Sequence, residues 1–264
     1  MTLALLTLAL TSCAGRGSEL IDPAGQSAVT SPATDTSPQA SAPASSATPE
    51  PVSAPVASSA PVTAVHPSPS SAPAAASAFS GTIADVDPAR LTHSWRPGCP
   101  VAVADLRFLT VSHWGFDGKV KSGELVVHRE QAANVIAVMR KLFDQRFPIE
   151  KIELIDKYQG DDDLSVAANN SSAFNCRSVI GRPGVWSQHS YGWAIDINPV
   201  QNPFINSGKL TPPSAESYRD RSQRLPGMIH ANDDVVKAFR SIGWSWGGYW
   251  NNPKDYQHFS LTGR

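Results

Sequence analysis

The sequence predicts an α+β domain, with a small antiparallel sheet and flanking helices, preceded by a disordered linker. Residues 1–78 hold only five charged side chains and consist mainly of Ala, Ser, Pro and Thr. Such a composition cannot bury enough apolar surface to offset the entropy of the chain. The remaining residues, 79–264, are enough for one domain with a sizeable core. They mix short strand patterns with one long and one short helix, without the regular strand–helix alternation of a parallel sheet.

The strand predictions follow runs of alternating or β-branched apolar residues. We expect strands at 101–112, 124–128, 149–155, 174–180, 194–197 and 256–261. Between these runs, turn residues mark the connections.

The clearest helix is expected at 130–144, where apolar residues keep helical spacing and Pro148 follows the end. A shorter helix is expected at 233–241, because an aspartate at its start suits the helix dipole. We expect a polar loop at 156–170, and an irregular, proline-rich excursion at 200–230. Within the polar loop, the acidic run 161–163 lacks the ligand spacing of a calcium loop, so it is expected to be a solvated surface.

The N-terminus predicts export. Residues 2–12 form an apolar run that is too short to span a bilayer and is typical of a signal peptide. Small residues lead into Cys13, as in the lipobox of bacterial lipoproteins. We therefore expect a signal segment at 1–13, lipidation of Cys13, and a linker at 14–78 that carries the domain from the membrane toward the cell wall. An ordinary signal peptide with an incidental cysteine is the alternative.

Charge and cysteine content limit the possible partners. The formal net charge is −1, which gives no electrostatic argument for binding nucleic acid or an anionic membrane surface. Cys99 and Cys176 remain once Cys13 is set aside, and in an oxidising compartment they most simply form a disulfide. Two buried free thiols are the alternative. The sequence contains no Cys-x-x-Cys motif, so a zinc site made of cysteines is not expected. We expect the protein to be a monomer.

Two short clusters predict a metal site. His189 lies seven residues before Asp196, with the turn-forming Gly192 between them, and a second cluster holds Asp255 and His258. A hydrolytic zinc site uses three protein ligands and leaves one position open for water. We therefore predict that His189, Asp196 and His258 bind one zinc ion.

Three further residues are candidates for the chemistry around that ion. Asp255, which is not itself a ligand, is the predicted general base for the attacking water. Arg177 is expected either to stabilise the oxyanion or to hold a substrate carboxylate. Ser187 is expected to contact the substrate or to orient His189.

Each of these assignments has a plainer alternative. His230 is the main rival to His258 as third ligand, and Arg177 could form a purely structural ion pair. We prefer His258 because Asp255 accompanies it and aromatic residues surround it. The tryptophans near these clusters are expected in the core rather than in a ligand platform: Trp193, Trp244, Trp246 and Trp250.

The same residues carry a resemblance to a known family. The pattern consists of Ser187-x-His189-x-x-Gly192-x-Ala194-x-Asp196 and the later Asp255-x-x-His258. It resembles the VanY-like peptidoglycan peptidases, which include zinc D-alanyl-D-alanine carboxypeptidases and L-alanyl-D-glutamate endopeptidases. Over about residues 95–262 the resemblance implies a hedgehog/DD-peptidase-like fold, Zn²⁺ as cofactor, the three ligands named above, Asp255 as base and a substrate-facing arginine.

These observations together predict an exported, lipid-anchored zinc metallopeptidase that hydrolyses peptide bonds in peptidoglycan stem peptides. A catalytically silent cell-wall binding lipoprotein with the same fold is the rival from another class. A zinc-dependent amidase acting on a different cell-wall bond is a second rival. The sequence leaves open which stem-peptide bond is cut.

Overall fold

A computed structural model describes residues 78–263. The predicted signal segment 1–13, the lipidation of Cys13 and all but the last residue of the linker 14–78 lie outside these residues. The predicted α+β class is confirmed, with small antiparallel sheets and few helices. Among the described residues, no helix is both long and apolar enough to cross a membrane.

The α-helices and strands are mostly short. The α-helices are α1 (Ala132–Asp144), α2 (Asp162–Ala167) and α3 (Asp234–Arg240). The strands are β1 (Gly81–Asp85), β2 (Leu106–Trp114), β3 (Val120–His128), β4 (Lys151–Ile152), β5 (Asn170–Ser171), β6 (Ser178–Val179), β7 (Arg182–Trp186), β8 (Ala194–Asp196), β9 (Phe204–Asn206), β10 (Lys209–Thr211), β11 (Ser245–Trp246), β12 (Lys254–Asp255) and β13 (His258–Ser260).

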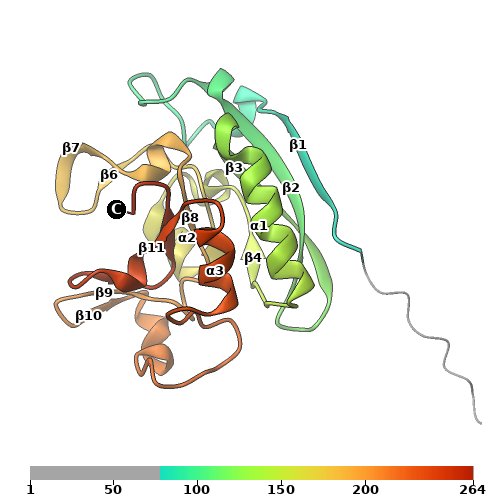
Figure 1. The fold of residues 1–264 in the computed structure, drawn as a ribbon. Coiled ribbons are helices and arrows are strands. Elements are labelled where there is room, and N and C mark those ends of the chain that lie inside the picture. The colour runs from blue at the N-terminus through green and yellow to red at the C-terminus, as the bar shows by residue number, and fades with distance from the viewer. Residues whose placement is uncertain (1–77, 264) are drawn as a thin grey trace, which may run out of the picture. The chain divides into compact units, whose positions relative to one another are not determined.

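The first sheet joins β1, β2 and β3 in sequence order, and all its pairs are antiparallel. Its two long strands meet at a turn around Gly118, and α1 lies along the curved sheet (Figure 1). Buried residues alternate with more exposed ones along β2, since successive side chains point to opposite faces of a sheet. In the strands of this region apolar residues recur about every two positions, and in α1 they recur about every 3.6 positions. Each element therefore has one apolar face, and these faces pack together.

The main core lies between this helix–sheet pair and the second part of the chain. Leu109, Val127 and Met139 belong to it on one side, and Ile195 and Phe259 on the other. Two aromatic rings, of Phe239 in α3 and Phe259 in β13, stack within it at 3.9 Å between centroids. The core therefore fixes β8 and β13, the strands that carry two of the predicted metal ligands.

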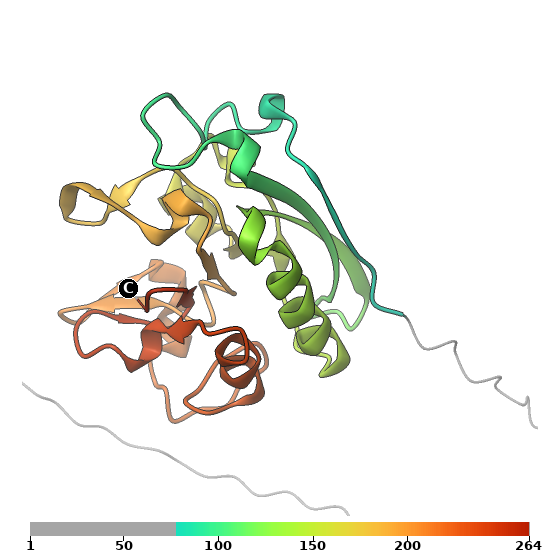
Figure 2. The same cartoon turned by 45° about the horizontal axis from the view of Figure 1, so that its top comes forward.

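The second part is built from small sheets. One sheet has the order β11-β13-β8 and another has the order β10-β9-β12. Two hairpins, β6–β7 and β9–β10, project from the same side of the domain, with the C-terminal end drawn between them (Figures 1 and 2). The hairpin β9–β10 pairs through β9 with β12, so it directly supports the strand of Asp255.

Several predicted elements agree closely with the structure. The helices expected at 130–144 and 233–241 are α1 and α3, and Asp233 caps α3 by accepting a hydrogen bond from the Val236 N–H at 2.9 Å. The short strand expected at 194–197 is β8. The expected bond between Cys99 and Cys176 is also present, so the disulfide prediction is confirmed.

Other expectations were wrong. The loop expected at 156–170 contains α2, because Asp161 caps a short helix through the Leu164 N–H at 3.0 Å. The strand expected at 174–180 is confined to β6, while Cys176 instead pairs its backbone N–H with Ser94. The excursion at 200–230 includes the hairpin β9–β10, and β1 was not predicted at all.

Candidate metal centre and active site

Two of the predicted ligands lie opposite each other on paired strands. In the antiparallel ladder of β8 and β13, Asp196 stands directly across from His258. Cross-strand partners place their side chains on the same face, within about 5 Å at Cβ. The backbone of Asp196 also pairs on its other side with Ser172, at 2.9 and 3.1 Å. The carboxylate is therefore carried by a strand that is hydrogen-bonded on both edges.

His189 reaches the same point from a short 3₁₀ helix, Gln188–Tyr191. Ser187 caps this helix, and its Oγ accepts a hydrogen bond from the His189 N–H at 3.4 Å. Gly192 ends it with φ +70°, and a Cβ there would come within 2.4 Å of the His128 backbone nitrogen. Only glycine combines this left-handed conformation with so close an approach to β3. The turn thus brings His189 back toward Asp196.

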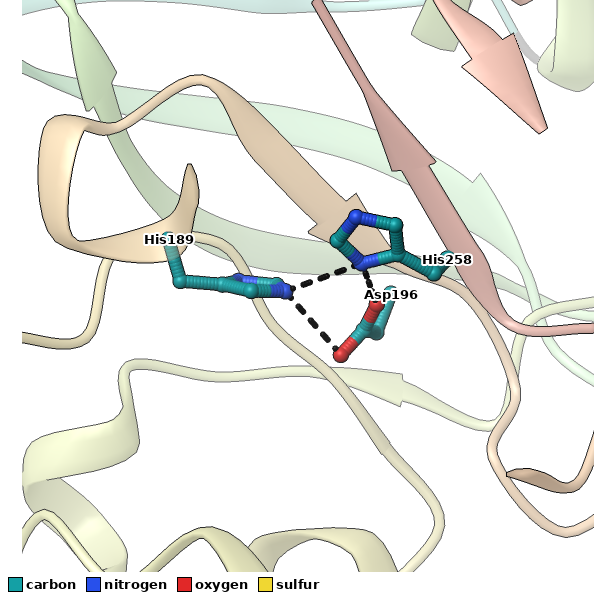
Figure 3. Close-up of side chains that lie close together, drawn as sticks. All are labelled: His189, Asp196 and His258. Carbon is teal, nitrogen blue, oxygen red and sulfur yellow. Dashed lines mark hydrogen bonds and ion pairs between the residues drawn. The ribbon is translucent and has the colours of Figure 1, made fainter. Parts of the chain in front are cut away.

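The three side chains converge, as Figure 3 shows. Nε2 of His189 lies 3.2 Å from Oδ2 of Asp196 and 3.2 Å from Nδ1 of His258, which in turn lies 2.9 Å from Oδ1 of Asp196. One ligand atom from each residue falls within 4.8 Å of the others. All three residues are at most 5% exposed, so water competes little for these atoms.

The hydrogen bonds around the triad fit a bound cation. Nδ1 of His189 donates to the Ala173 carbonyl at 2.5 Å, which leaves a lone pair on Nε2 in the neutral ring. That lone pair faces the Asp196 carboxylate. Either a second proton on His189 or a metal ion must therefore lie between them. Holding a ligating ring by its other nitrogen is the usual arrangement in protein metal sites.

The Asp196 carboxyl is held ionised despite its burial. Burial acts to raise the pKa of Asp196, but the charges and hydrogen bonds of His189 and His258 outweigh it and lower the pKa. An anionic oxygen with two imidazole nitrogens forms a donor set that suits Zn²⁺. The residues present therefore fit a metal ion, and the group His189, Asp196 and His258 can hold one.

Asp255 lies in β12, three residues before His258. Its carboxyl has a pKa raised to about 7, because burial disfavours the charged form and the Asp196 carboxylate repels it. Oδ1 of Asp255 is buried and has no hydrogen-bond partner among residues 78–263. Gly247 packs against this strand so closely that a Cβ would meet the Asp255 carbonyl oxygen at 2.5 Å. Asp255 is thus a partly buried acid available for proton transfer.

Arg177 lies between the disulfide and the hairpin β6–β7. Its Nη2 forms an ion pair with Oδ2 of Asp162 at 3.0 Å. Its backbone N–H donates to Ser190 Oγ at 2.9 Å, and that hydroxyl donates to the Arg177 carbonyl at 2.6 Å. The positive charge of Arg177 acts on Asp255 and lowers its pKa, though less than His258 does. Arg177 therefore lies within electrostatic reach of the predicted base.

The structure separates the rival candidates from this cluster. His230 is not part of it; its backbone N–H donates to Asp233 at 2.7 Å, and burial first, then the charge of Arg221, lowers the pKa of its ring. Trp244 and Trp246 are buried in the core. Trp250 contacts His258, with 5.4 Å between ring centroids, so one aromatic side chain does border the cluster.

Sequence reasoning missed three groups that support the site. Asp162, in the acidic run expected to be solvated, pairs with Arg177. Ser190 fixes the Arg177 backbone, and the Ala173 carbonyl orients His189. A signal existed only for Asp162, since Asp161–Asp163 followed by Leu-Ser-Val-Ala is a helix start. Every residue has a backbone carbonyl, so the sequence does not indicate that the Ala173 carbonyl orients His189.

Comparison with protein families agrees with this site. Residues 181–261 match a family model described as D-alanyl-D-alanine carboxypeptidase. This segment is similar to that family. The predicted resemblance is therefore confirmed. The segment contains His189, Asp196, Asp255 and His258, whereas Arg177 lies just before it. Neither the curated proteins nor the solved structures gave a significant match.

The D-alanyl-D-alanine carboxypeptidase match supports a hydrolase that acts as a peptidase. The family match also agrees with the geometry of the site, because it covers every residue of the triad and the predicted base. It begins after β6 and leaves out α1 and the first sheet. Those elements support the matched segment through the shared core.

Proposed function

We propose that this protein is a zinc-dependent peptidase that hydrolyses peptide bonds in the stem peptides of peptidoglycan. The observation that carries the proposal is the convergence of His189, Asp196 and His258 within a segment of the D-alanyl-D-alanine carboxypeptidase family. Three protein ligands of this kind leave a coordination position for a reactant. When bound, zinc supplies Lewis acidity that polarises the scissile carbonyl and makes water acidic enough to react at neutral pH.

Asp255 moves the proton in this proposal. Its carboxylate accepts a proton from the attacking water as the oxygen bonds to the scissile carbonyl carbon. The same carboxyl then delivers that proton to the leaving nitrogen as the carbon–nitrogen bond breaks, which yields a free acid and an amine. A pKa raised to about 7 by burial suits both steps near neutral pH. A bound cation nearby lowers that pKa and favours the base form.

Arg177 binds negative charge in this proposal. Its Nε–H is buried without a hydrogen-bond partner among the described residues, so this donor is available to an oxygen ligand that reaches it. The ligand is either the oxyanion of the reacting carbonyl or a carboxylate of the stem peptide. Ser187 holds the turn of His189, and contact between Ser187 and substrate belongs to the proposal.

The family description favours the bond between two terminal D-alanines as the one cut. A carboxypeptidase of this kind must recognise a free terminal carboxylate, which gives Arg177 a natural ligand. Cleavage between L-alanine and D-glutamate is the other possibility for the same site. Export, lipidation of Cys13 and a linker that spans into the cell wall would place the enzyme beside this substrate.

The test compares defined stem peptides by mass spectrometry. The full chain, loaded with zinc, is expected to release D-alanine from a pentapeptide stem, to lose this activity with a chelator and to regain it with added zinc. Asp255→Asn is expected to lower kcat about 10²- to 10⁴-fold while zinc content is unchanged. Asp144→Asn, an exposed acid at the end of α1, is the matched control and should keep the parental rate.

Three results would change the proposal. Cleavage after L-alanine instead would assign the endopeptidase specificity. Zinc and stem-peptide binding without any turnover would favour a silent cell-wall binding protein. A purified chain that takes up no zinc would reject the metallopeptidase altogether.

A further inference from the structure

We propose that Asp162 is a positioning residue for Arg177, which fixes the direction of the guanidinium toward the reacting peptide. The inference deepens the proposed function and rests on it, because it assumes that Arg177 faces substrate. Asp162 itself touches neither substrate nor metal in this proposal.

The ion pair between these residues differs from the others in the domain. Its side chains are 22% and 23% exposed. In every other Lys or Arg pair of residues 78–263 that the structure shows, at least one partner is more than 40% exposed, for example Glu216 with Arg219 and Asp117 with Lys121. Exposed pairs contribute little because water screens them and long side chains lose entropy. The Asp162 pair is more shielded, so it constrains its arginine more strongly.

Asp162 is itself rigidly placed. Asp161 takes the capping role at the start of α2, accepting from the Leu164 N–H at 3.0 Å, so Asp162 is left free to face Arg177. The helix is anchored below by buried Ser165, whose Oγ accepts from Asn170 Nδ2 at 3.0 Å. The neighbouring Asp163 is exposed and forms no ion pair within residues 78–263. Asp162 and Asp163 are therefore adjacent acids that differ in their contacts: Asp162 is ion-paired with Arg177, and Asp163 forms no ion pair among the described residues.

Arg177 is held at its backbone by other groups, which leaves its side chain to Asp162. Ser190 bonds to both the N–H and the carbonyl of Arg177, and the Ser187 N–H donates to the same carbonyl at 3.1 Å. At the guanidinium, Nη1 makes only a 3.4 Å contact with the Ser178 carbonyl. The ion pair at Nη2 is thus the main restraint on where the guanidinium points.

The restraint leaves one donor of the guanidinium unpaired. Nε–H of Arg177 is buried and has no partner among the described residues. An unsatisfied buried donor destabilises the protein, and an oxyanion or carboxylate bound to Nε–H would relieve this cost. The guanidinium is planar, so an ion pair at Nη2 also fixes the directions in which its other N–H groups point. This arrangement suits recognition of an anionic oxygen.

Both members of the pair are near the proposed base. After burial, Asp196 and His258, the next charges that act on Asp255 are those of Arg177 and Asp162, with opposite effects. Asp162 therefore also offsets the positive charge of Arg177 next to a site built for a cation.

The experiment measures kcat and KM of the zinc-loaded full chain on the pentapeptide stem. Asp162→Asn is expected to lower kcat/KM about 10- to 100-fold, with zinc content unchanged. A rise in KM would assign the substrate carboxylate to Arg177, and a fall in kcat would assign the oxyanion. Asp163→Asn, which changes the same charge in the same helical turn, should stay within about twofold of the parent. Asp162→Glu is expected to recover part of the loss.

A double-mutant cycle separates positioning from a structural role. In an Arg177→Ala background, Asp162→Asn should have almost no further effect, because its action passes through the arginine. An equal loss in both backgrounds would overturn the proposal, as would equal effects of Asp162→Asn and Asp163→Asn.

An NMR measurement keeps the two proposals distinguishable. The Nε–Hε group of Arg177 should lose order on the ps–ns timescale in Asp162→Asn and keep it in Asp163→Asn. If the parent hydrolyses no stem peptide, the proposed function fails, and this signal alone decides whether Asp162 holds the arginine. Unchanged order in Asp162→Asn would reject the positioning role.

Discussion

The helix–sheet region, residues 79–152, and the site region, residues 165–262, bury different kinds of side chain. In the helix–sheet region the buried polar residues are Ser94, His113 and Gln131. In the site region they are Ser165, Asn170, Ser171, Ser172, Asn175, Ser187, His189, Ser190, Asp196, Asn198, Gln201, Asn202, Gln257, His258 and Ser260. The first region is held by apolar packing and regular ladders, whereas the second depends on buried side-chain hydrogen bonds.

Asn202 illustrates how the site region is organised. Its amide nitrogen donates to the carbonyls of Ile197 and Gly227, and its oxygen accepts from the Ile229 N–H at 2.7 Å. One side chain therefore satisfies three backbone groups of segments that form no ladder together. Asn198 does the same for Pro148 and Glu150, which ties the site region to the end of the helix–sheet region.

The difference shows how this domain divides two tasks. Apolar burial supplies most of the free energy of folding and does so without fixing single atoms closely. Buried polar networks contribute little net stability, but an unpaired member is costly, so they tolerate few alternative arrangements. The site region can thus hold ligand atoms in place because the helix–sheet region stabilises the shared core.

The largest expected effect is loss of zinc, and it should follow the removal of a buried histidine from the site region but not from the helix–sheet region. His258→Ala should abolish zinc binding and with it hydrolysis, because it removes one of three ligands. His113→Ala makes the same truncation at a buried histidine of β2 and should leave zinc content unchanged. Zinc is measured by elemental mass spectrometry of the purified full chain, with about one ion per chain expected in the parent.

Stability measurements complete this comparison. His113→Ala is expected to lower the melting temperature of metal-free protein, since it leaves a gap in the helix–sheet region. Full zinc occupancy in His258→Ala would show that the ligand set is wrong, with His230 the first alternative to examine. Loss of zinc in folded His113→Ala would show that the two regions are not independent.

The two regions also differ in how far their structure could be predicted from the sequence. Helix α1 was placed within two residues of its start because its apolar positions repeat with the helical period. The expected strand at 101–112 ended too early, since His113 continues the buried positions of β2. Periodicity is a local property, so it missed the end of β2, where a polar residue occupies a buried position.

In the site region the local motif was informative and the remote contacts were not. His189, Gly192 and Asp196 are close enough in sequence for their spacing to predict convergence. The pairing of Asp162 with Arg177 depends on α2 packing beside a segment fifteen residues later, and no pattern in either segment encodes it. From the sequence alone, Asp162 is therefore predicted to be a solvated acid, and only the fold shows its ion pair with Arg177.

A smaller effect tests the packing of the helix–sheet region. Leu109 in β2 is fully buried in the main core, so Leu109→Ala should lower the free energy of unfolding by about 2–5 kcal/mol. Ile83→Ala in β1, where the side chain is 46% exposed, is the control and should change it far less. Zinc stoichiometry of the folded protein should stay the same in both. Denaturant unfolding gives the energies, and a Leu109→Ala cost below that of Ile83→Ala would contradict the core assignment.

The smallest expected effect concerns the stability cost of a functional acid in the site region. In metal-free protein, burial raises the pKa of Asp255 from 3.8 to about 7. The folded state therefore binds its proton more tightly than the unfolded state does, and the associated stability is present below about pH 4 and lost as pH rises through 7. At pH 8 this loss is at most about 4 kcal/mol, and the partial exposure of Asp255 reduces it.

Asp255→Asn should thus stabilise the metal-free protein at pH 8 relative to the parent, and this gain should disappear near pH 4. Chemical denaturation at both pH values measures it, with Asp144→Asn as the matched control. A gain that does not depend on pH would mean that the Asp255 carboxyl is not held in a raised-pKa environment.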